Sequence, residues 1–250
     1  MAVVAIIPAR YASTRLPGKP LALIGGKPMI QHVYENTCKT PGLNRVIVAT
    51  DDRRILETAK SFGAEAVMTS AKHASGTDRL AEVARKIRVE WLVNIQGDLP
   101  FIRPQTILKT LNPLRRDRSI PMGTARTPIF DRDEWLNPNV VKVITDREGF
   151  ALYFSRAPIP YARGDNGGPA PVKSRAIFGY RHLGVYVYRR DFLLKFAVMR
   201  QTALEQTEKL EQLRALSNGY RIRVADVDEP SIEVDTPADL ERAEAYWRTQ

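Results

Sequence analysis

The chain has 250 residues, of which 44% are hydrophobic and 26% are charged. A chain of this length and composition can bury a substantial core, so the disordered, fibrous and small-scaffold classes of protein are excluded. Its 38 basic and 28 acidic side chains give a net charge of +10, which indicates an anionic partner such as nucleic acid, a membrane surface or a charged small molecule.

Apolar, β-rich runs alternate with amphipathic helical patterns over the first hundred residues. The runs that predict buried strands are 2–7, 45–50, 65–68 and 91–95. The patterns that predict helices between them are 28–39, 53–62 and 76–86. Strands and helices that alternate in this way form βαβ units, so we predict an α/β fold with a mostly parallel, doubly wound central sheet.

The middle of the chain has a different pattern and predicts a smaller lobe with mixed or antiparallel strands. The strand-like segments are 122–129, 140–146, 150–154 and, after a Gly- and Pro-rich loop at 163–172, the alternating segment 181–188. The remaining predictions are helices at 190–198, 204–216 and 237–247 and a strand at 220–227. Within 204–216, we expect Leu204, Leu210 and Leu213 to face inward.

Two features bear on location. The apolar run at the N-terminus ends at Pro8, which is too short for a signal peptide or a membrane span, so we expect no stable membrane insertion. The single cysteine, Cys38, excludes an internal disulfide and a multi-cysteine metal site and favours a cytoplasmic protein. Cys38 also falls on the apolar stripe of helix 28–39, so we expect a core residue.

A basic loop follows the first predicted strand. Residues 1–30 contain no acidic side chain and four basic ones, Arg10, Arg15, Lys19 and Lys27. Ligands of open α/β sheets bind at the carboxyl ends of the strands, where this loop begins. Cations and backbone N–H groups that converge there would bind a polyphosphate, although the glycine spacing fits neither of the common phosphate-loop motifs. A solvated basic loop is the alternative.

Two aspartates are candidate ligands for a metal ion. Asp98 follows the predicted strand 91–95, a position suited to a Mg²⁺ ligand but also common in turns. Asp235 precedes Thr236 and Pro237, so either Asp235 or Thr236 could simply cap the helix that Pro237 opens. Sequence spacing alone does not bring the two aspartates together.

A second basic region, 156–200, has nine Lys and Arg residues against two Asp and would suit a carboxylate-bearing substrate. Arg156 stands at a strand end before two prolines, which favours a site residue over a surface ion pair. For His182 we prefer a partly exposed strand histidine over a ligand-binding role. Glu211 and Gln212 are expected on the surface of helix 204–216, unless they bind a ligand.

Eight segments, in chain order, resemble the 3-deoxy-manno-octulosonate (Kdo) cytidylyltransferases, also called CMP-Kdo synthetases. They are PARYASTRLPGKPL (8–21), SGTDR (75–79), NIQGD (94–98), NPNVVK (137–142), ALYFSRA (151–157), HLGVY (182–186), EKLEQLR (208–214) and VDTPADL (234–240). The resemblance runs from about residue 3 to residue 245. It implies a Rossmann-like nucleotidyltransferase fold in a homodimer that requires Mg²⁺.

The resemblance also implies an activity: CTP and Kdo are coupled to CMP-Kdo and pyrophosphate, for lipopolysaccharide assembly. The anomeric hydroxyl of Kdo would attack the α-phosphorus in line, with no covalent enzyme intermediate. Nucleotide binding falls to a core of about 1–120 and 220–250, within a single domain. Sugar binding and dimerisation fall to about 121–219.

Residue roles follow from the matching positions. Those implied for CTP are Arg10, Arg15, Lys19, Ser75, Thr77, Arg79 and Gln96. Asp98 and Asp235 are implied as the Mg²⁺ ligands, which favours the metal role for Asp235 over the role of helix cap. Together with Arg10 and Lys19, the two aspartates form the implied catalytic set. Those implied for the sugar acid are Arg156, His182, Tyr186, Glu211 and Gln212.

One position departs from the family's pattern. Leu99 stands where an acidic residue usually follows Asp98, a loss that a related branch acting on 8-amino-Kdo shares. Kdo is nevertheless the acceptor we expect, because segment 137–139 agrees better with the Kdo enzymes. The segment 163–180 matches poorly and is assigned no role. A nucleic-acid-binding module is the alternative from another class, but the basic residues are dispersed among acidic ones.

Overall fold

The computed structural model describes residues 2–12, 15–161, 177–228 and 232–250. Residue contacts divide the chain into two compact units. Unit 1 comprises Met1–Leu108, Val185–Ala197 and Ser231–Gln250, and unit 2 comprises Lys109–Gly184 and Val198–Pro230. The predicted loop at 163–172 lies outside the described residues. Which unit binds which substrate stays a prediction.

Unit 1 contains a mostly parallel sheet with the strand order β10-β6-β1-β4-β5. Its strands are β1 (Val3–Ala9), β4 (Arg45–Thr50), β5 (Glu65–Met68), β6 (Trp91–Ile95) and the second half of β10 (Gly179–Arg189). Only β10 runs antiparallel to its neighbour, β6. Every residue of β1 and β6 is buried, as expected for strands covered on both faces. The predicted α/β class is thereby confirmed.

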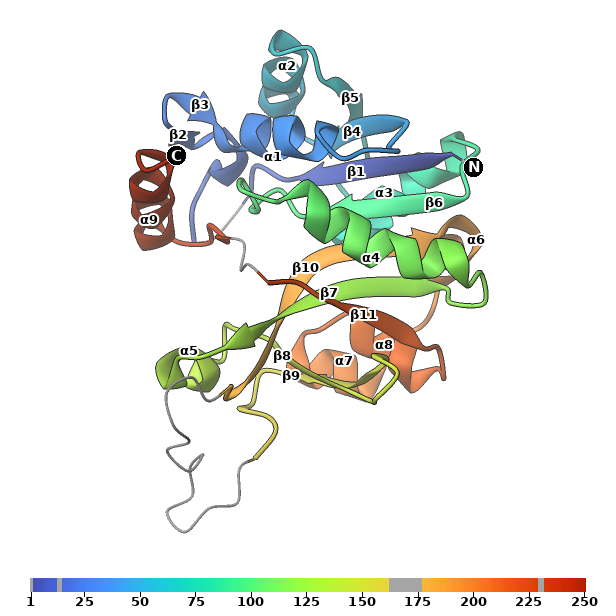
Figure 1. Ribbon diagram of the computed structural model, residues 1–250. Helices are drawn as coiled ribbons and strands as arrows, with labels where there is room; N and C mark the ends of the chain where they lie inside the picture. Colours follow the sequence, from blue (N-terminus) through green and yellow to red (C-terminus); the bar gives the residue numbers. More distant parts are fainter. Residues whose placement is uncertain (1, 13–14, 162–176, 229–231) are drawn as a thin grey trace. The chain divides into compact units, whose positions relative to one another are not determined.

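Helices cover both faces of this sheet. They are α1 (Met29–Cys38), α2 (Arg53–Ser61), α3 (Gly76–Lys86) and α6 (Arg190–Phe196), with α4 (Pro104–Arg116) running from unit 1 into unit 2. In Figure 1, α1 lies in front of the strands and α3 lies behind them. The short 3-10 helix η1 (Lys19–Leu21) and the hairpin β2 (Leu23–Ile24) and β3 (Lys27–Pro28) follow β1, and α9 (Pro237–Trp247) packs beside this hairpin (Figure 1).

Unit 2 is built on β7 (Met122–Ile129), which pairs in parallel with β11 (Ile222–Asp226) and neighbours the first half of β10. The antiparallel hairpin of β8 (Lys142–Thr145) and β9 (Ala151–Ser155) joins β10 where Lys142 pairs with Arg181. The helices of unit 2 besides α4 are α5 (Arg132–Leu136), α7 (Ala203–Glu208) and α8 (Gln212–Ser217). This is the smaller, mixed lobe that the sequence predicts.

Three local predictions are wrong. The predicted helix 204–216 is two helices, because Lys209 takes a left-handed conformation (φ 54°) and ends α7. Leu204 is exposed, while Leu210 and Leu213 are buried as expected. Cys38 is exposed, because it is the last residue of α1, where the helix ends at the protein surface.

Within the described residues, every helix is too short or too polar to cross a membrane.

Candidate active site

Lys19 holds two carboxylates together in unit 1. Its ammonium lies 2.7 Å from Oδ2 of Asp98 and 3.0 Å from Oδ1 of Asp235, and the Arg15 guanidinium lies 3.1 Å from the other oxygen of Asp235. Burial alone would lower the pKa of Lys19, but the two aspartates outweigh burial and raise that pKa above its ordinary value. Two carboxylates and two cations therefore form one compact charged cluster.

The local folding of two distant segments explains why Asp98 and Asp235 meet. Asp98 lies just beyond the end of β6, and its carbonyl accepts a hydrogen bond of 3.0 Å from the backbone N–H of Val234. A side chain at Gly97 would place its Cβ 3.1 Å from the carbonyl oxygen of Pro8, so a glycine permits the close approach to the end of β1. These backbone contacts deliver both aspartates to the carboxyl edge of the sheet.

The side chain of Thr236, rather than Asp235, caps α9. Thr236 accepts from the backbone N–H of Asp239 and completes a capping box with the Asp239 carboxylate. The alternative in which Asp235 caps the helix is therefore wrong, and its carboxylate is left for Lys19 and Arg15. Among the described residues, no group of three or more His, Cys, Asp or Glu side chains is arranged to hold a metal ion. Asp98 and Asp235 are thus a pair of hard oxygen donors, the type that Mg²⁺ takes from proteins when substrate phosphates and water complete its shell.

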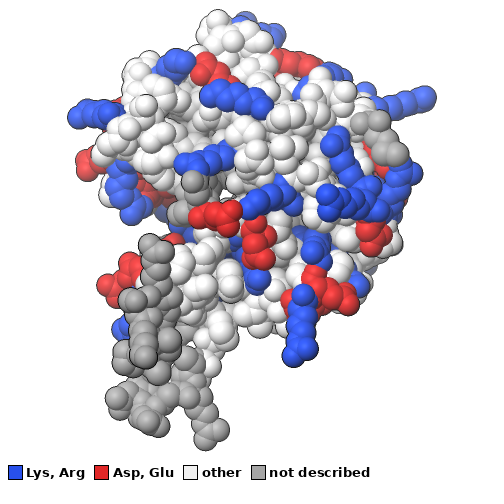
Figure 2. Space-filling model, in the orientation of Figure 1, with Lys and Arg blue, Asp and Glu red and all other residues white. Residues whose placement is uncertain are grey.

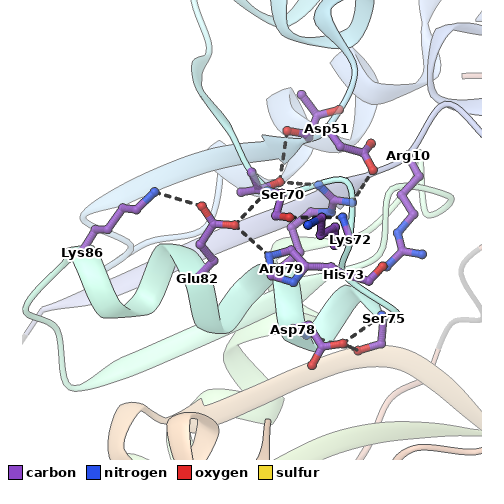
Figure 3. A network of polar contacts seen from close by, with 12 residues as sticks. Arg10, Asp51, Ser70, Lys72, His73, Ser75, Asp78, Arg79, Glu82 and Lys86 are labelled. Atoms are coloured by element: carbon purple, nitrogen blue, oxygen red, sulfur yellow. Dashed lines mark hydrogen bonds and ion pairs between the residues drawn. The ribbon is translucent and has the colours of Figure 1, made fainter. Parts of the chain in front are cut away.

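Arg10 lies at the end of β1 and is fixed by the segment that precedes α3. Its guanidinium donates to the backbone carbonyls of His73, at 2.9 Å, and Ala74, at 3.2 Å. Figure 3 shows the Arg10 side chain beside the segment 70–75. Arg10 is therefore held in place by neutral backbone oxygens and keeps its positive charge uncompensated by these contacts.

The segment 75–79 opens α3 and turns inward. Ser75 caps the helix in a capping box with Asp78. Arg79 is fully buried; its Nη2 lies 2.8 Å from Oδ2 of Asp51, and its Nη1 also contacts Thr69. Its Nε has no hydrogen-bond partner among the described residues. Thr77 is buried as well, and Gln96, at the end of β6, is half-buried.

Glu82 organises the same region and was missed by the sequence analysis. One carboxylate oxygen accepts from the backbone N–H of Ser70, at 2.9 Å, and lies 2.7 Å from Nε2 of His73. The other oxygen contacts Lys86 at 3.0 Å (Figure 3). The Ser70 N–H, followed by His73 and Lys86, lowers the pKa of Glu82 to about 2. Only the Glu82–Lys86 spacing on α3 was visible as a signal in the sequence.

In unit 2, Arg156 is anchored by Glu208, the last residue of α7. The Arg156 Nε donates to the Glu208 carbonyl at 2.8 Å, and its backbone N–H donates to the Glu208 carboxylate at 2.9 Å. Nη1 donates to the carbonyl of Pro138 at 3.0 Å. Nη2 has no recorded partner among the described residues, so one nitrogen of this guanidinium is available to a ligand.

His182 is buried, so the expectation of a partly exposed histidine is wrong. Its Nε2 lies 2.9 Å from the Thr124 hydroxyl, and the Phe154 ring packs edge-on against the imidazole with the two ring centroids 5.0 Å apart. Burial, with a smaller effect from Arg181, lowers the pKa of His182 to about 3. Because β10 places the imidazole in the interior of unit 2, burial keeps it neutral at physiological pH.

The other residues implied for the sugar acid differ in exposure. Gln212 opens α8 and is buried, contrary to its expected surface position, because the break at Lys209 reorients α8. The Gln212 amide nitrogen has no hydrogen-bond partner among the described residues. Glu211 is half-buried. Tyr186 is half-buried on the part of β10 that belongs to unit 1 and stacks on Tyr188 at 5.8 Å.

Comparison with known proteins identifies the family. A cytidylyltransferase family profile matches residues 4–222. The chain is 55% identical over 248 residues to a 3-deoxy-manno-octulosonate cytidylyltransferase of Syntrophotalea carbinolica, covering 99% of both chains. The chain belongs to the 3-deoxy-manno-octulosonate cytidylyltransferase family.

Further relatives agree with this assignment. A 3-deoxy-manno-octulosonate cytidylyltransferase of Geobacter metallireducens is 56% identical over 245 residues, which cover 97% of this chain and 96% of that one. A solved structure of a CMP:2-keto-3-deoxy-manno-octonic acid synthetase complexed with CTP superposes with a TM-score of 0.91 at 43% identity, covering 100% and 99% of the two chains. A Leptospira borgpetersenii cytidylyltransferase, at 18% identity and a TM-score of 0.65, shares the fold.

In this cytidylyltransferase, Leu99 is fully buried, whereas the neighbouring Asp98 is half-buried. An acidic residue at position 99 would be desolvated in the same backbone conformation. Its replacement by leucine therefore suits the local packing, and any consequence for acceptor choice stays a prediction.

Proposed function

We propose that this cytidylyltransferase transfers CMP from CTP to the anomeric hydroxyl of Kdo and releases pyrophosphate. The observation that carries the proposal is the cluster of Lys19, Asp98 and Asp235, in which two carboxylates share one ammonium at the carboxyl edge of the sheet. Full-length similarity to a CMP:2-keto-3-deoxy-manno-octonic acid synthetase complexed with CTP supports CTP as the nucleotide substrate. The proposal includes a homodimer in the cytoplasm and a place in lipopolysaccharide biosynthesis.

Arg10, Arg15 and Lys19 are the residues proposed to bind the triphosphate. All three belong to the acid-free first 30 residues, and Arg10 is held by neutral carbonyls that leave its charge available to an anion. Positive groups fixed before the reaction stabilise negative charge that grows on phosphate oxygens in the transition state. Their contribution is positioning and electrostatic stabilisation, and no nucleophilic side chain is required.

Asp98 and Asp235 are the proposed ligands of Mg²⁺. The donor set fits, because both offer carboxylate oxygens and both already face one shared cation, Lys19. When bound, Mg²⁺ would neutralise charge on the phosphate oxygens. Ser75, Thr77, Arg79 and Gln96 are proposed to hold the cytidine, with Arg79 acting from within the core, where Asp51 fixes its guanidinium.

The sugar acid is proposed to bind Arg156, His182, Glu211 and Gln212 of unit 2, and a role for Tyr186 stays a prediction. Arg156 has one guanidinium nitrogen to offer to a carboxylate. No acceptor for the buried Gln212 amide nitrogen is found in the part of the chain that the structure describes, a costly state that an oxygen of a bound sugar would relieve. His182, which is neutral, would serve as a hydrogen-bonding group rather than a positive charge.

The activity test is pyrophosphate release from CTP and Mg²⁺ with Kdo, 8-amino-Kdo or a sialic acid. Release that depends on Kdo supports the proposal, and no release with any of the three acids overturns it. Leu99 favours the amino sugar as a second candidate acceptor, and the ratio of kcat/KM values for the two sugars decides between them.

The nucleic-acid alternative has a separate test. On the face drawn in Figure 2, Lys and Arg side chains are scattered among acidic ones rather than joined in one stripe. Such a distribution is poor for tracking a phosphate backbone. A nucleic-acid-binding function requires affinity that falls steeply with salt, and binding of this kind at physiological ionic strength would favour it.

A further inference from the structure

Lys142 is a buried charged residue that the proposed chemistry does not use. It lies on β8 at the end of the segment NPNVVK, and its side chain is inaccessible to solvent. Its ammonium donates to the carbonyls of Asn137, at 2.9 Å, Val140, at 2.6 Å, and Arg156, at 2.6 Å. All three N–H bonds of the ammonium therefore have acceptors, and all three acceptors are backbone oxygens.

Two of these carbonyls belong to the segment 137–140, which also holds the Arg156 side chain, and the third belongs to Arg156 itself. Pro138, which accepts from Arg156 Nη1, lies between Asn137 and Val140, the other two partners of Lys142. The carbonyl of Arg156 itself accepts from Lys142. A shift of the Lys142 ammonium would therefore move both the backbone of Arg156 and one of its side-chain acceptors.

Glu208 makes the remaining contacts to Arg156 and its neighbour Ser155. Its carboxylate accepts hydrogen bonds from the Ser155 hydroxyl at 2.6 Å and from the Arg156 backbone N–H at 2.9 Å. Its backbone carbonyl accepts a hydrogen bond from Arg156 Nε at 2.8 Å. Arg156 is thus fixed through its N–H, its carbonyl, Nε and Nη1. Nη2 is the nitrogen that these contacts leave over.

We infer that Lys142 and Glu208 are positioning residues for acceptor binding, which together fix the Arg156 guanidinium so that Nη2 meets the carboxylate of the sugar acid. The inference rests on the proposed function. It assigns the two residues to the affinity for the acceptor and not to the affinity for CTP or to the chemical step. A fixed donor binds a carboxylate more tightly than a mobile one, because less side-chain freedom is lost.

The charge on Lys142 gives a pH signature. Burial, followed by the neighbouring Arg156, lowers the pKa of Lys142 to about 8, and Glu208 opposes this shift; Arg181 is the residue paired with Lys142 on β10. Above that pH, a neutral amine has two N–H bonds for three carbonyls, so one contact is lost. The KM for the acceptor should therefore rise above about pH 8 in the wild type.

The test measures KM for Kdo, KM for CTP and kcat in the wild type, Glu208→Ala, Glu208→Gln and Lys142→Gln. Glu208→Ala should raise KM for Kdo by about tenfold or more, the scale of effects expected from a misplaced binding group, and change kcat and KM for CTP less than about twofold. Glu208→Gln should restore most of the loss, because an amide can accept from the Arg156 N–H and donate to Ser155. Lys109→Met, which removes an exposed lysine of unit 2, is the matched control.

The outcomes separate the two proposals. A wild type that does not use Kdo refutes the proposed function. If the wild type is active, two results for Glu208→Ala refute the positioning role. One is an unchanged KM for Kdo, and the other is a change in kcat and in KM for CTP as large as the change in KM for Kdo. Lys142→Gln should lack the rise in KM above pH 8, and a rise equal to that of the wild type would contradict the assignment to Lys142. If Lys142→Gln does not fold, the Glu208 variants and the wild-type pH profile still decide.

Discussion

Replacement of Lys19 by methionine removes the cation that two aspartates share. Both carboxylate oxygens lie within 3.0 Å of the ammonium, so they are separated by no more than the sum of the two distances, 2.7 and 3.0 Å, or about 5.7 Å. Two unit charges at that separation repel by about 0.7 kcal/mol in water and by about 3 kcal/mol at an effective dielectric constant of about 20. The Lys19 side chain is 16% exposed, so the site lies between these limits. We expect Lys19→Met to lower the free energy of unfolding by about 1–2 kcal/mol.

The same variant should lose affinity for the transition state of the triphosphate. Removal of one fixed charge-stabilising group costs about 10²–10³ in rate, or about 3–4 kcal/mol, so kcat/KM for CTP should fall by that factor. Pyrophosphate release at saturating acceptor, with CTP varied, measures the loss. Mg²⁺ should also raise the melting temperature of Lys19→Met more than that of the wild type, since the two carboxylates then lack their internal cation.

Two controls isolate the role of Lys19. Lys60→Met removes an exposed lysine from the last turn of α2 and should leave both quantities unchanged. Lys19→Arg keeps the charge and should retain the stability. An effect of Lys19→Met on KM for Kdo alone, or a loss in kcat/KM for CTP below about threefold, would refute the reasoning.

Three further changes test separate parts of the molecule. Asp98→Asn should abolish Mg²⁺-dependent turnover with an unchanged circular dichroism spectrum, and substantial residual turnover would count against the metal role. Glu205→Gln leaves the Arg214 guanidinium buried without its counter-charge, now at 2.5 Å, and should cost about 3–5 kcal/mol in urea unfolding; a loss below about 1 kcal/mol would contradict it. Glu82 has a folded pKa of about 2 against an ordinary 4.5, so its stabilisation is present above pH 4.5 and is lost as the pH falls toward 2. Glu82→Gln should therefore be less stable than the wild type by about 1–2 kcal/mol at pH 7. Thermal unfolding should show this difference in stability shrink below pH 4.5, and a difference that stays constant with pH would mean that another group is responsible.

Local patterns were sufficient where an element depends on its own residues. The strands at 45–50, 65–68, 91–95 and 122–129 have the predicted bounds. The runs 45–50 and 91–95 are mostly apolar and are followed by polar residues, so their ends are visible in the sequence. Ser75 and the pair Thr236 and Pro237 mark the starts of α3 and α9 correctly, since capping is a local interaction. Helix α4 was missed, although Ile107, Leu111 and Leu114 give a buried stripe at helical spacing; its internal Pro113 masked the pattern.

Features that depend on distant partners were not predictable from periodicity. The division of 204–216 into two helices follows from tertiary contacts. Glu208 accepts a hydrogen bond from Arg156, and Glu205 forms an ion pair with Arg214 across the break at Lys209. The meeting of Asp98 with Asp235 likewise requires the backbone contact between Val234 and Asp98. The resemblance to the family predicted a shared metal-binding role for Asp98 and Asp235, whereas sequence spacing alone left Asp235 as a possible helix cap.

Phosphorus NMR of the reaction mixture tests the central claim most directly. With the wild-type protein, CTP, Mg²⁺ and Kdo, we expect the CTP signals to be replaced by one phosphodiester signal from CMP-Kdo and one pyrophosphate signal of twice that intensity, since pyrophosphate contains two equivalent phosphorus atoms. Omission of Kdo should leave CTP intact. Persistent CTP in the complete mixture, or conversion of CTP that does not depend on a sugar acid, would contradict the account.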